Sequence, residues 1–372
     1  MRRSHMTLMV KPASAACNLK CDYCFYFDAV SMRSEGCHHM MDDTVVEAII
    51  MKSLQEAESC TYVFQGGEPT LAGLPFFKRF IDRVNAYKLP DSTVRYTFQT
   101  NALNLDRDWA RFFKQHDMLV GVSFDGTPRL HDFHRMDRNG NGSGRKVINS
   151  ISMLEEEGVD FNILCVVTNE LAQNIRQVFS YLVNHNLRYH QYIPCMDPLA
   201  GDVSYLTPDM YSRFLRDLFD LWFSAYRKGT PVSIRLFDNL VGMIAGYPPE
   251  SCDMAGICSI QYVAESNGDI YPCDFYCTDD HLLGSIAVDS FKDLDARRSA
   301  MLFIENSANR VDPCTECRWK LLCRGGCRRY RTDEGYRFCS SMKEFFPYVI
   351  ERMQIVAQDS FSSVSPPSRF VF

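Results

Sequence analysis

Residues 17–24 read C-N-L-K-C-D-Y-C, which places Cys17, Cys21 and Cys24 in the spacing C-x3-C-x2-C. Three thiolates on one short loop can bind three irons of a [4Fe–4S] cluster and leave the fourth iron open to a small chelating ligand. A zinc loop, or three unrelated cysteines, is the alternative. The position of this loop within the fold helps to decide between them.

Short β-rich runs alternate with helical patterns through the first two thirds of the chain. Strands are predicted at 8–11, 61–65, 94–99, 119–123, 160–167 and 189–193, and helices at 42–58, 74–87, 106–116, 145–157, 171–185 and 207–227. Six βα units of this kind predict an α/β fold with a parallel sheet and outer helices. Because there are six units and not eight, we expect a partial (β/α)6 barrel of the TIM-like type.

Polar motifs follow nearly every predicted strand. The cysteine loop follows the first strand, and residues 65–69 (Q-G-G-E-P), 99–101, 123–126 and 194–198 come at the ends of later strands. In folds of this kind the chemistry takes place at the carboxyl ends of the strands. The motifs and the barrel therefore support each other, and they place one active-site face at that edge.

The amino and carboxylate groups of S-adenosylmethionine suit the vacancy on the fourth iron, and an electron from the cluster can break its sulfonium C–S bond. The motif and its flanks resemble the radical S-adenosylmethionine superfamily across the whole barrel half. The resemblance implies a [4Fe–4S] cluster on the three cysteines and a set of cofactor contacts: Tyr23, Gly66, Gly67, Glu68, Ser123, Arg135 and Met196. On its own, the Gly-Gly-Glu-Pro tetrapeptide is only a turn.

The βα rhythm stops near residue 235, and cysteines become dense from Cys252 to Cys339. We therefore divide the chain into a barrel domain, 1–235, and a metal-organised domain, 236–372. Eight of the nine cysteines in the second domain fall into two groups, C-x5-C-x14-C from Cys252 and C-x2-C-x5-C-x3-C from Cys314, followed by Cys339. Eight thiolates suffice for two further [4Fe–4S] clusters, although C-x2-C pairs also bind zinc.

The whole pattern resembles the twin-cluster SPASM domain of peptide-modifying radical enzymes. The resemblance assigns one cluster to Cys252, Cys258, Cys273 and Cys327, and the other to Cys314, Cys317, Cys323 and Cys339. The chain would then hold three [4Fe–4S] clusters. Five cysteines have no assigned role: Cys37, Cys60, Cys165, Cys195 and Cys277.

Asp274 lies directly after Cys273 in the stretch Y-P-C-D-F-Y, where a carboxylate could act as a general base. An isolated aspartate would more often cap a turn or pair with an arginine. However, this stretch, with residues 65–71, 161–168 and 323–329, resembles the anaerobic sulfatase-maturating enzymes. The similarity runs from about Val10 to a final helix predicted at about 342–357. Ala102 and Thr127 depart from that family, where glycine and proline are usual.

The resemblance implies that the chain oxidises a cysteine or serine of a sulfatase to Cα-formylglycine. A 5′-deoxyadenosyl radical would take a hydrogen from the substrate Cβ. Asp274 would accept the thiol or hydroxyl proton, and an auxiliary cluster would accept the remaining electron. The expected partners are an unfolded sulfatase segment with a Cys/Ser-x-Pro/Ala-x-Arg motif and an electron donor such as flavodoxin or ferredoxin. The sequence does not choose between cysteine and serine.

The main alternative is a radical maturase that forms thioether or carbon–carbon links in a ribosomal peptide. Such enzymes commonly carry an N-terminal recognition domain, and only sixteen residues precede Cys17 here. A non-catalytic iron–sulfur carrier would not need the polar strand ends. The net charge of −6 argues against a general nucleic-acid-binding protein, and no apolar run is long enough to predict a membrane span. The large number of thiols favours the reducing cytoplasm.

Overall fold

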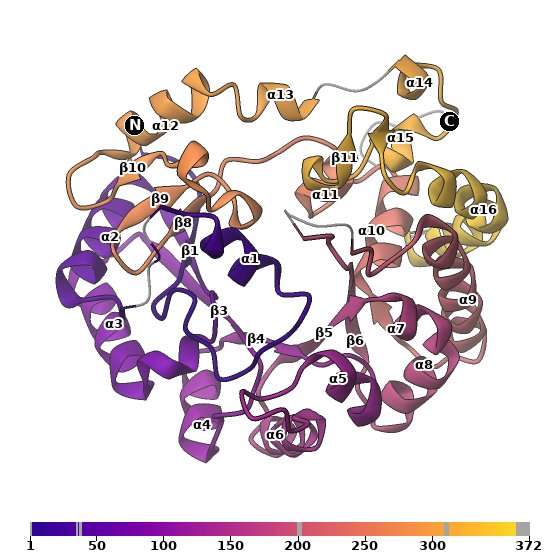
Figure 1. Cartoon of the computed structure of the whole chain (residues 1–372), viewed down its shortest axis with the longest axis horizontal. Helices are drawn as coiled ribbons and strands as arrows, with labels where there is room; N and C mark the ends of the chain where they lie inside the picture. Colours follow the sequence, from indigo (N-terminus) through magenta and orange to yellow (C-terminus); the bar gives the residue numbers. More distant parts are fainter. Residues whose placement is uncertain (1, 35, 37–38, 199–202, 309–311, 362–372) are drawn as a thin grey trace.

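The computed structural model describes residues 2–34, 36, 39–198, 203–308 and 312–361. One curved sheet organises them, with the strand order β10-β9-β8-β1-β2-β3-β4-β5-β6-β7 (Figure 1). Its parallel strands are β1 (Met6–Val10), β2 (Ser59–Phe64), β3 (Thr93–Thr100), β4 (Leu119–Ser123), β5 (Phe161–Val167), β6 (Tyr189–Pro194) and β7 (Ser233–Ile234). The predicted partial barrel is confirmed, and β7 adds a short seventh parallel strand.

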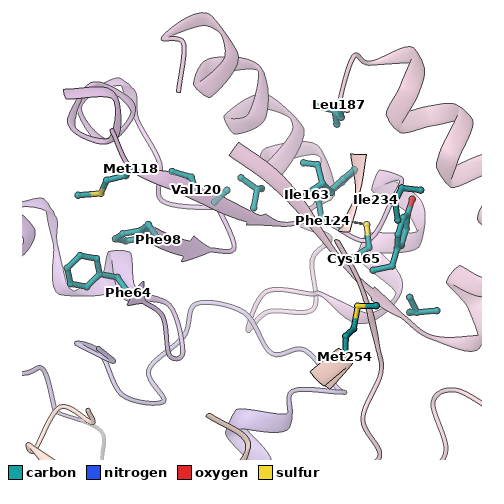
Figure 2. Packing of buried hydrophobic residues seen from close by; sticks show 14 of the residues in the cluster. Phe64, Phe98, Met118, Val120, Phe124, Ile163, Cys165, Leu187, Ile234 and Met254 are labelled. Carbon is teal, nitrogen blue, oxygen red and sulfur yellow. Dashed lines mark hydrogen bonds between the residues drawn. The ribbon is translucent and has the colours of Figure 1, made fainter. Parts of the chain in front are cut away.

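Helices cover the outer face of this sheet (Figure 1). They are α2 (Asp43–Glu56), α3 (Leu74–Tyr87), α4 (Arg107–Gln115), α6 (Gly144–Glu156), α8 (Ile175–Asn184) and α9 (Pro208–Arg227). Alternate strand residues pack under them: Cys60, Tyr62 and Phe64 of β2 are fully buried, whereas the residues between them are only partly buried. Figure 2 shows how Phe64 and Phe98 continue this apolar layer from strand to strand.

Several short helices escape the sequence prediction. The predicted helix over 171–185 is two helices, α7 (Asn169–Gln173) and α8, because the backbone leaves helical geometry at Asn174. Others were not predicted, among them α1 (Phe25–Ser31), α5 (Pro128–His134) and α10 (Arg235–Ile244). Short helices carry little periodicity, and α1 begins where the Cys24 Sγ accepts the Phe27 N–H.

The later region is built from short elements and one long helix. They are α11 (Cys252–Ala255), β8 (Tyr262–Ala264), β9 (Asp269–Tyr271), β10 (Gly284–Ser285), α12 (Phe291–Ala300), α13 (Glu305–Ala308), α14 (Asp312–Thr315), α15 (Lys320–Cys323), β11 (Arg331–Thr332), β12 (Gly335–Tyr336) and α16 (Cys339–Phe361). Single 3-10 turns are η1 (Pro69–Ala72), η2 (Asp274–Tyr276), η3 (Asp279–His281) and η4 (Arg328–Tyr330).

The later region joins the barrel along both of its edges. Strand β8 pairs in parallel with β1 and antiparallel with β9, so the β8–β10 strands extend the barrel sheet. At the other edge α16 packs on α9. The division after residue 235, which falls one residue into α10, stays a prediction. None of the described helices has the length and apolar character that a membrane crossing needs.

Candidate active site

The predicted polar motifs gather at the carboxyl edge of the sheet. Chain segments that follow β1 and β2 touch there, since the Gly67 N–H donates to the Ser14 carbonyl at 2.7 Å and the Glu68 N–H donates to the Ala16 carbonyl at 2.8 Å. Glycine is required at position 67 because a Cβ there would lie 2.2 Å from the Ala16 carbonyl oxygen. The Gly-Gly-Glu-Pro segment is thus held against the cysteine loop.

The three cysteines of that loop are partly buried neighbours. Burial raises the pKa of Cys17 to about 11, and the N–H of Leu19 and the amide of Asn101 act in the opposite direction. Burial also raises the pKa of Cys21 to about 12; Arg135 opposes it, and Cys24 and Cys17 add to it. The cysteines must lose their protons to bind iron, although burial has raised their pKa, and the positive charge of the metal compensates for this.

Glu68 is fully buried, and both of its carboxylate oxygens are engaged. Oε1 accepts from Thr70 and from the Thr100 hydroxyl at 2.8 Å, and Oε2 accepts from the Asn101 N–H at 2.7 Å. Burial raises its pKa, although these donors act against the rise. The side chain therefore ties the loop after β2 to the end of β3.

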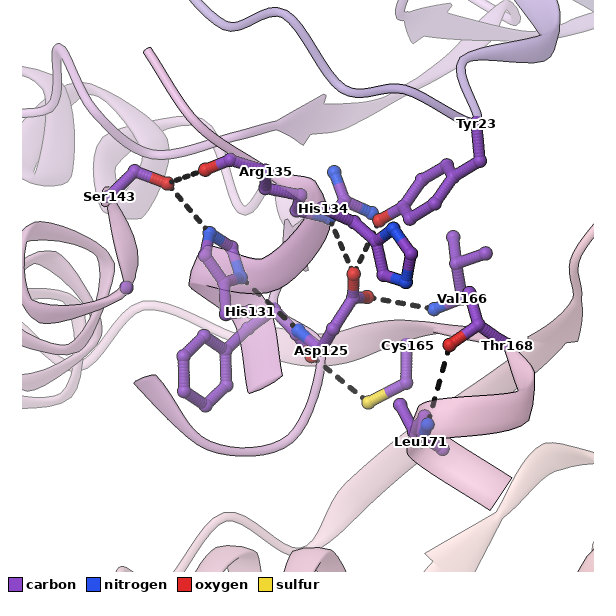
Figure 3. Close-up of polar contacts among 12 residues, drawn as sticks. Tyr23, Asp125, His131, His134, Arg135, Ser143, Cys165, Val166, Thr168 and Leu171 are labelled. Carbon is purple, nitrogen blue, oxygen red and sulfur yellow. Dashed lines mark hydrogen bonds and ion pairs between the residues drawn. The ribbon is translucent and has the colours of Figure 1, made fainter. Parts of the chain in front are cut away.

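Asp125, just past the end of β4, organises the predicted cofactor contacts Tyr23 and Arg135 (Figure 3). Its Oδ2 accepts from the Tyr23 hydroxyl and from Arg135 Nε at 2.9 Å, and its Oδ1 accepts from the Val166 N–H at 2.9 Å. Burial raises its pKa, but Arg135, His131 and Tyr23 outweigh burial, so the pKa is lowered. Sequence reasoning missed Asp125, although it belongs to the quoted Ser-Phe-Asp-Gly motif.

The remaining predicted contacts also lie at this edge. Ser123 ends β4 and Met196 lies two residues past β6, and both are buried. The later region holds the segment after β6 in place. Tyr330 donates to the Pro194 carbonyl at 2.5 Å, and Arg337 forms an ion pair with Asp197 at 2.5 Å.

The cysteines of the later region fall into two neighbourhoods. Burial raises the pKa of Cys323 to about 11, with Cys339, Cys317 and Cys314 adding to it, and these four residues line one small cavity. Burial likewise raises the pKa of Cys327 to about 12, with Cys252 and Cys258 adding to it, and Cys327 and Cys252 act in the same way on Cys273. These neighbourhoods have the same members as the two predicted ligand sets.

Asp274 is held by two side chains that come from the barrel. Its Oδ1 pairs with the ammonium of Lys11, and its Oδ2 accepts from Gln65 Nε2 at 2.7 Å. Lys11 is fully buried, and its Nζ lies 3.2 Å from the centroid of the Tyr26 ring. Burial lowers the pKa of Lys11, but Asp274, Cys277 and Glu265 outweigh burial, so the lysine stays charged.

A second buried carboxylate, Glu265, balances the charge of Arg33 beside Lys11. Its Oε1 accepts from the Tyr26 hydroxyl at 2.5 Å and from Arg33 Nη2 at 3.0 Å, and its Oε2 accepts from Ser14 at 3.1 Å. This network joins α1, the segment after β1, and β8. Neither Lys11 nor Glu265 was predicted, because an isolated charge in a sequence carries no signal of its partner.

Four of the cysteines without an assigned role are buried: Cys60, Cys165, Cys195 and Cys277. Cys60 and Cys165 belong to the main apolar core, and Figure 2 shows Cys165 there. The fifth, Cys37, lies outside the described residues. The fifteen cysteines that the structure describes are all free thiols.

The Radical SAM superfamily model matches residues 12–182. Over the full length, the cysteine-type anaerobic sulfatase-maturating enzyme of Clostridium novyi (strain NT) is 40% identical over 365 residues, which is 95% of this chain and 97% of that protein. The chain belongs to the anaerobic sulfatase-maturating enzymes. The serine-type enzyme of Klebsiella pneumoniae is 28% identical, over 95% of this chain and 89% of that protein.

A solved structure of this family has the same fold. Native anSMEcpe with bound AdoMet and Cp18Cys peptide matches with a TM-score of 0.89 and 38% identity, over 95% of this chain and 99% of that one. Like the rest of this family, the chain is a radical S-adenosylmethionine enzyme that binds S-adenosylmethionine and [4Fe–4S] clusters. The fold class predicted from the sequence, including the SPASM region, is confirmed.

The donor chemistry of this family member fits those groups. Three thiols lie on one loop and eight more form two sets of four neighbours, and thiolates are the ligands that iron–sulfur clusters use. Within the part of the chain that the structure describes, no three His, Cys, Asp or Glu side chains converge on a point that would hold a single metal ion.

A cavity of about 1430 Å³ lies inside the curved sheet. Strand residues line it, from Gln99 near the carboxyl edge to residues 117–119 and 186–189 at the opposite edge. Lys11, Gln65 and Asp274 are not among the residues that line it.

Proposed function

We propose that this chain oxidises a cysteine side chain in an unfolded sulfatase segment to Cα-formylglycine. The observation that carries the proposal is full-length similarity to cysteine-type enzymes of this family at 38–40% identity, against 28% for the serine-type enzyme of Klebsiella pneumoniae. This adds the choice between cysteine and serine, which the sequence alone leaves open.

In this proposal, Cys17, Cys21 and Cys24 hold the cluster that binds S-adenosylmethionine. Tyr23, Gly66, Gly67, Glu68, Ser123, Arg135 and Met196 surround that cofactor, with Asp125 fixing two of them. The two sets of four later cysteines hold the auxiliary clusters. When bound, these groups supply the carbon radical that removes a substrate hydrogen and the acceptor for the electron that follows.

Asp274 acts as the base that takes the proton of the substrate thiol. Lys11 and Gln65 fix the direction of its carboxylate, and a base must lie within hydrogen-bond reach of the proton it accepts. Each carboxylate oxygen has two lone pairs, so both contacts leave acceptor capacity for a substrate. The side chain directly follows Cys273, which puts proton uptake beside the proposed route of the electron.

The proposed partners are an unfolded sulfatase polypeptide with a Cys-x-Pro-x-Arg motif and a low-potential electron donor of the flavodoxin or ferredoxin kind. A flexible segment is needed because the substrate Cβ must approach the reacting carbon closely. The free thiols of the described residues suit a reducing compartment, so we place the enzyme in the cytoplasm.

The test is an anaerobic incubation of the reconstituted enzyme with two peptides that differ only in Cys or Ser at the modified position. We expect 5′-deoxyadenosine with both peptides, and an aldehyde that forms faster on the cysteine peptide. Deoxyadenosine without aldehyde on either peptide would refute the proposal. Faster oxidation of the serine peptide would refute the choice of cysteine.

A further inference from the structure

Asn101 places a side-chain hydrogen-bond donor on the first cysteine of the loop. It is a buried residue that directly follows β3, and its Nδ2 donates to Cys17 Sγ at 3.7 Å and to Asn18 Oδ1 at 2.7 Å. A donor–sulfur separation of this length is ordinary for N–H···S hydrogen bonds, since sulfur is larger than oxygen. The contact joins the end of β3 to the loop after β1.

The orientation of this amide is fixed from both sides. Its own Oδ1 accepts the Leu103 N–H at 3.1 Å, so the NH2 group is the part that faces Cys17. The backbone N–H of Asn101 donates to Glu68 Oε2 at 2.7 Å, and Glu68 also accepts from the Thr100 hydroxyl. Glu68 therefore holds the segment from which Asn101 reaches the sulfur.

We propose that Asn101, held by Glu68, is a positioning residue that raises the reduction potential of the cluster bound through Cys17. The inference rests on the cluster ligands assigned in the proposed function. A hydrogen bond to a ligating sulfur stabilises the reduced cluster more than the oxidised one, because the reduced cluster carries one more negative charge. Cleavage of S-adenosylmethionine begins with reduction of this cluster, so the contact makes the first step easier.

Two sulfurs of this loop also accept hydrogen bonds from backbone N–H groups. The Leu19 N–H donates to Cys17 Sγ at 3.4 Å, and the Phe27 N–H donates to Cys24 Sγ at 3.4 Å. A side-chain substitution leaves these contacts intact. Asn101 lies 84 residues away from Cys17 in the chain, so it can be changed without altering the loop sequence.

The experiment is a redox titration of the holoenzyme followed by electron paramagnetic resonance, with Asn101→Leu compared with the wild type. The relevant signal is the one that changes when S-adenosylmethionine is added, and the two auxiliary clusters are internal references. We expect the midpoint potential of this cluster to become more negative by about 59 mV in the variant. At a fixed potential this makes the ratio of reduced to oxidised cluster about tenfold lower. The auxiliary midpoints should not move.

Asn104→Leu is the matched control. Its Oδ1 accepts from Asn18 Nδ2 at 3.1 Å, so it contacts the same loop without reaching a sulfur, and its midpoint should equal that of the wild type. If the leucine variant at position 101 does not assemble its clusters, Asn101→Ser replaces it, because the serine hydroxyl is too short to reach Cys17.

An unchanged midpoint in an assembled Asn101 variant, or an equal shift in Asn104→Leu, would overturn the inference while leaving the proposed function intact. Absence of any signal that responds to S-adenosylmethionine in the wild type would overturn both.

Discussion

Lys11→Met tests the buried ion pair that holds the proposed base. Methionine keeps the length of the side chain but leaves the Asp274 carboxylate without its cation in a site where Lys11 is fully buried. Breaking a buried pair by removing one partner costs about 3–5 kcal/mol, because a charge stays buried and unpaired. For a chain of 372 residues this corresponds to a melting temperature lower by about 4–6 °C.

The assay is thermal unfolding of the reconstituted enzyme without oxygen, with the double variant Lys11→Met/Asp274→Asn in parallel. Removing both charges should restore at least half of the lost stability. Arg352→Met is the control, since Arg352 pairs with Asp220 near the surface and should cost under about 1 kcal/mol. A change of less than about 1 °C in Lys11→Met, or a double variant no more stable than the single one, would refute this reasoning.

Three further predictions concern the loops of the site. Gly67→Ala should weaken binding of S-adenosylmethionine at least tenfold in an equilibrium binding assay, because the new Cβ would lie 2.2 Å from the Ala16 carbonyl oxygen. The control is Gly242→Ala, which should bind normally because only one atom lies near its Cβ. Burial lowers the pKa of His131 to about 3; Asp125 acts against this shift, and Arg135 adds to it. Below about pH 6.5 the unfolded chain therefore binds a proton that the folded chain does not. The free energy of unfolding should therefore fall by about 1.4 kcal/mol per pH unit in that range. Between pH 7 and pH 5 the melting temperature of His131→Gln should fall by about 2 °C less than that of the wild type. An equal fall in both proteins would contradict this. Ala102→Gly should change the unfolding free energy by less than about 1 kcal/mol, since relief of strain at φ 62° offsets the lost methyl burial and the greater chain entropy; denaturant unfolding would reveal a larger effect.

Sequence patterns were sufficient for the six longer parallel strands and for the edge where the site lies, but not for the short strands β7 to β10. Buried and partly buried residues alternate along strands such as β2, and the polar motifs begin where these runs end. The spacing of cysteines groups Cys314, Cys317 and Cys323, but the placement of Cys327 beside Cys252 was implied only by the family resemblance, because those two residues lie far apart in the chain. The departure noted at Ala102 is visible in the structure as a left-handed backbone, the conformation that glycine adopts without strain.

Long-range charge pairs could not be predicted. Lys11 and Asp274 lie 263 residues apart, and nothing in either segment identifies the other. The same holds for Tyr26 and Glu265, which meet only because β8 pairs with β1. Residues such as Asp125 and Asn101 act through their neighbours, so their roles become visible only when the carboxyl edge of the sheet is assembled.

The most direct test of the central claim is the ratio of formylglycine to 5′-deoxyadenosine in one anaerobic reaction with a Cys-x-Pro-x-Arg peptide. The wild type should give comparable amounts of both products. The Asp274→Asn variant should continue to form deoxyadenosine but give little formylglycine. Undiminished formylglycine in Asp274→Asn would contradict the assignment of the base, and deoxyadenosine without formylglycine in the wild type would contradict the proposed reaction itself.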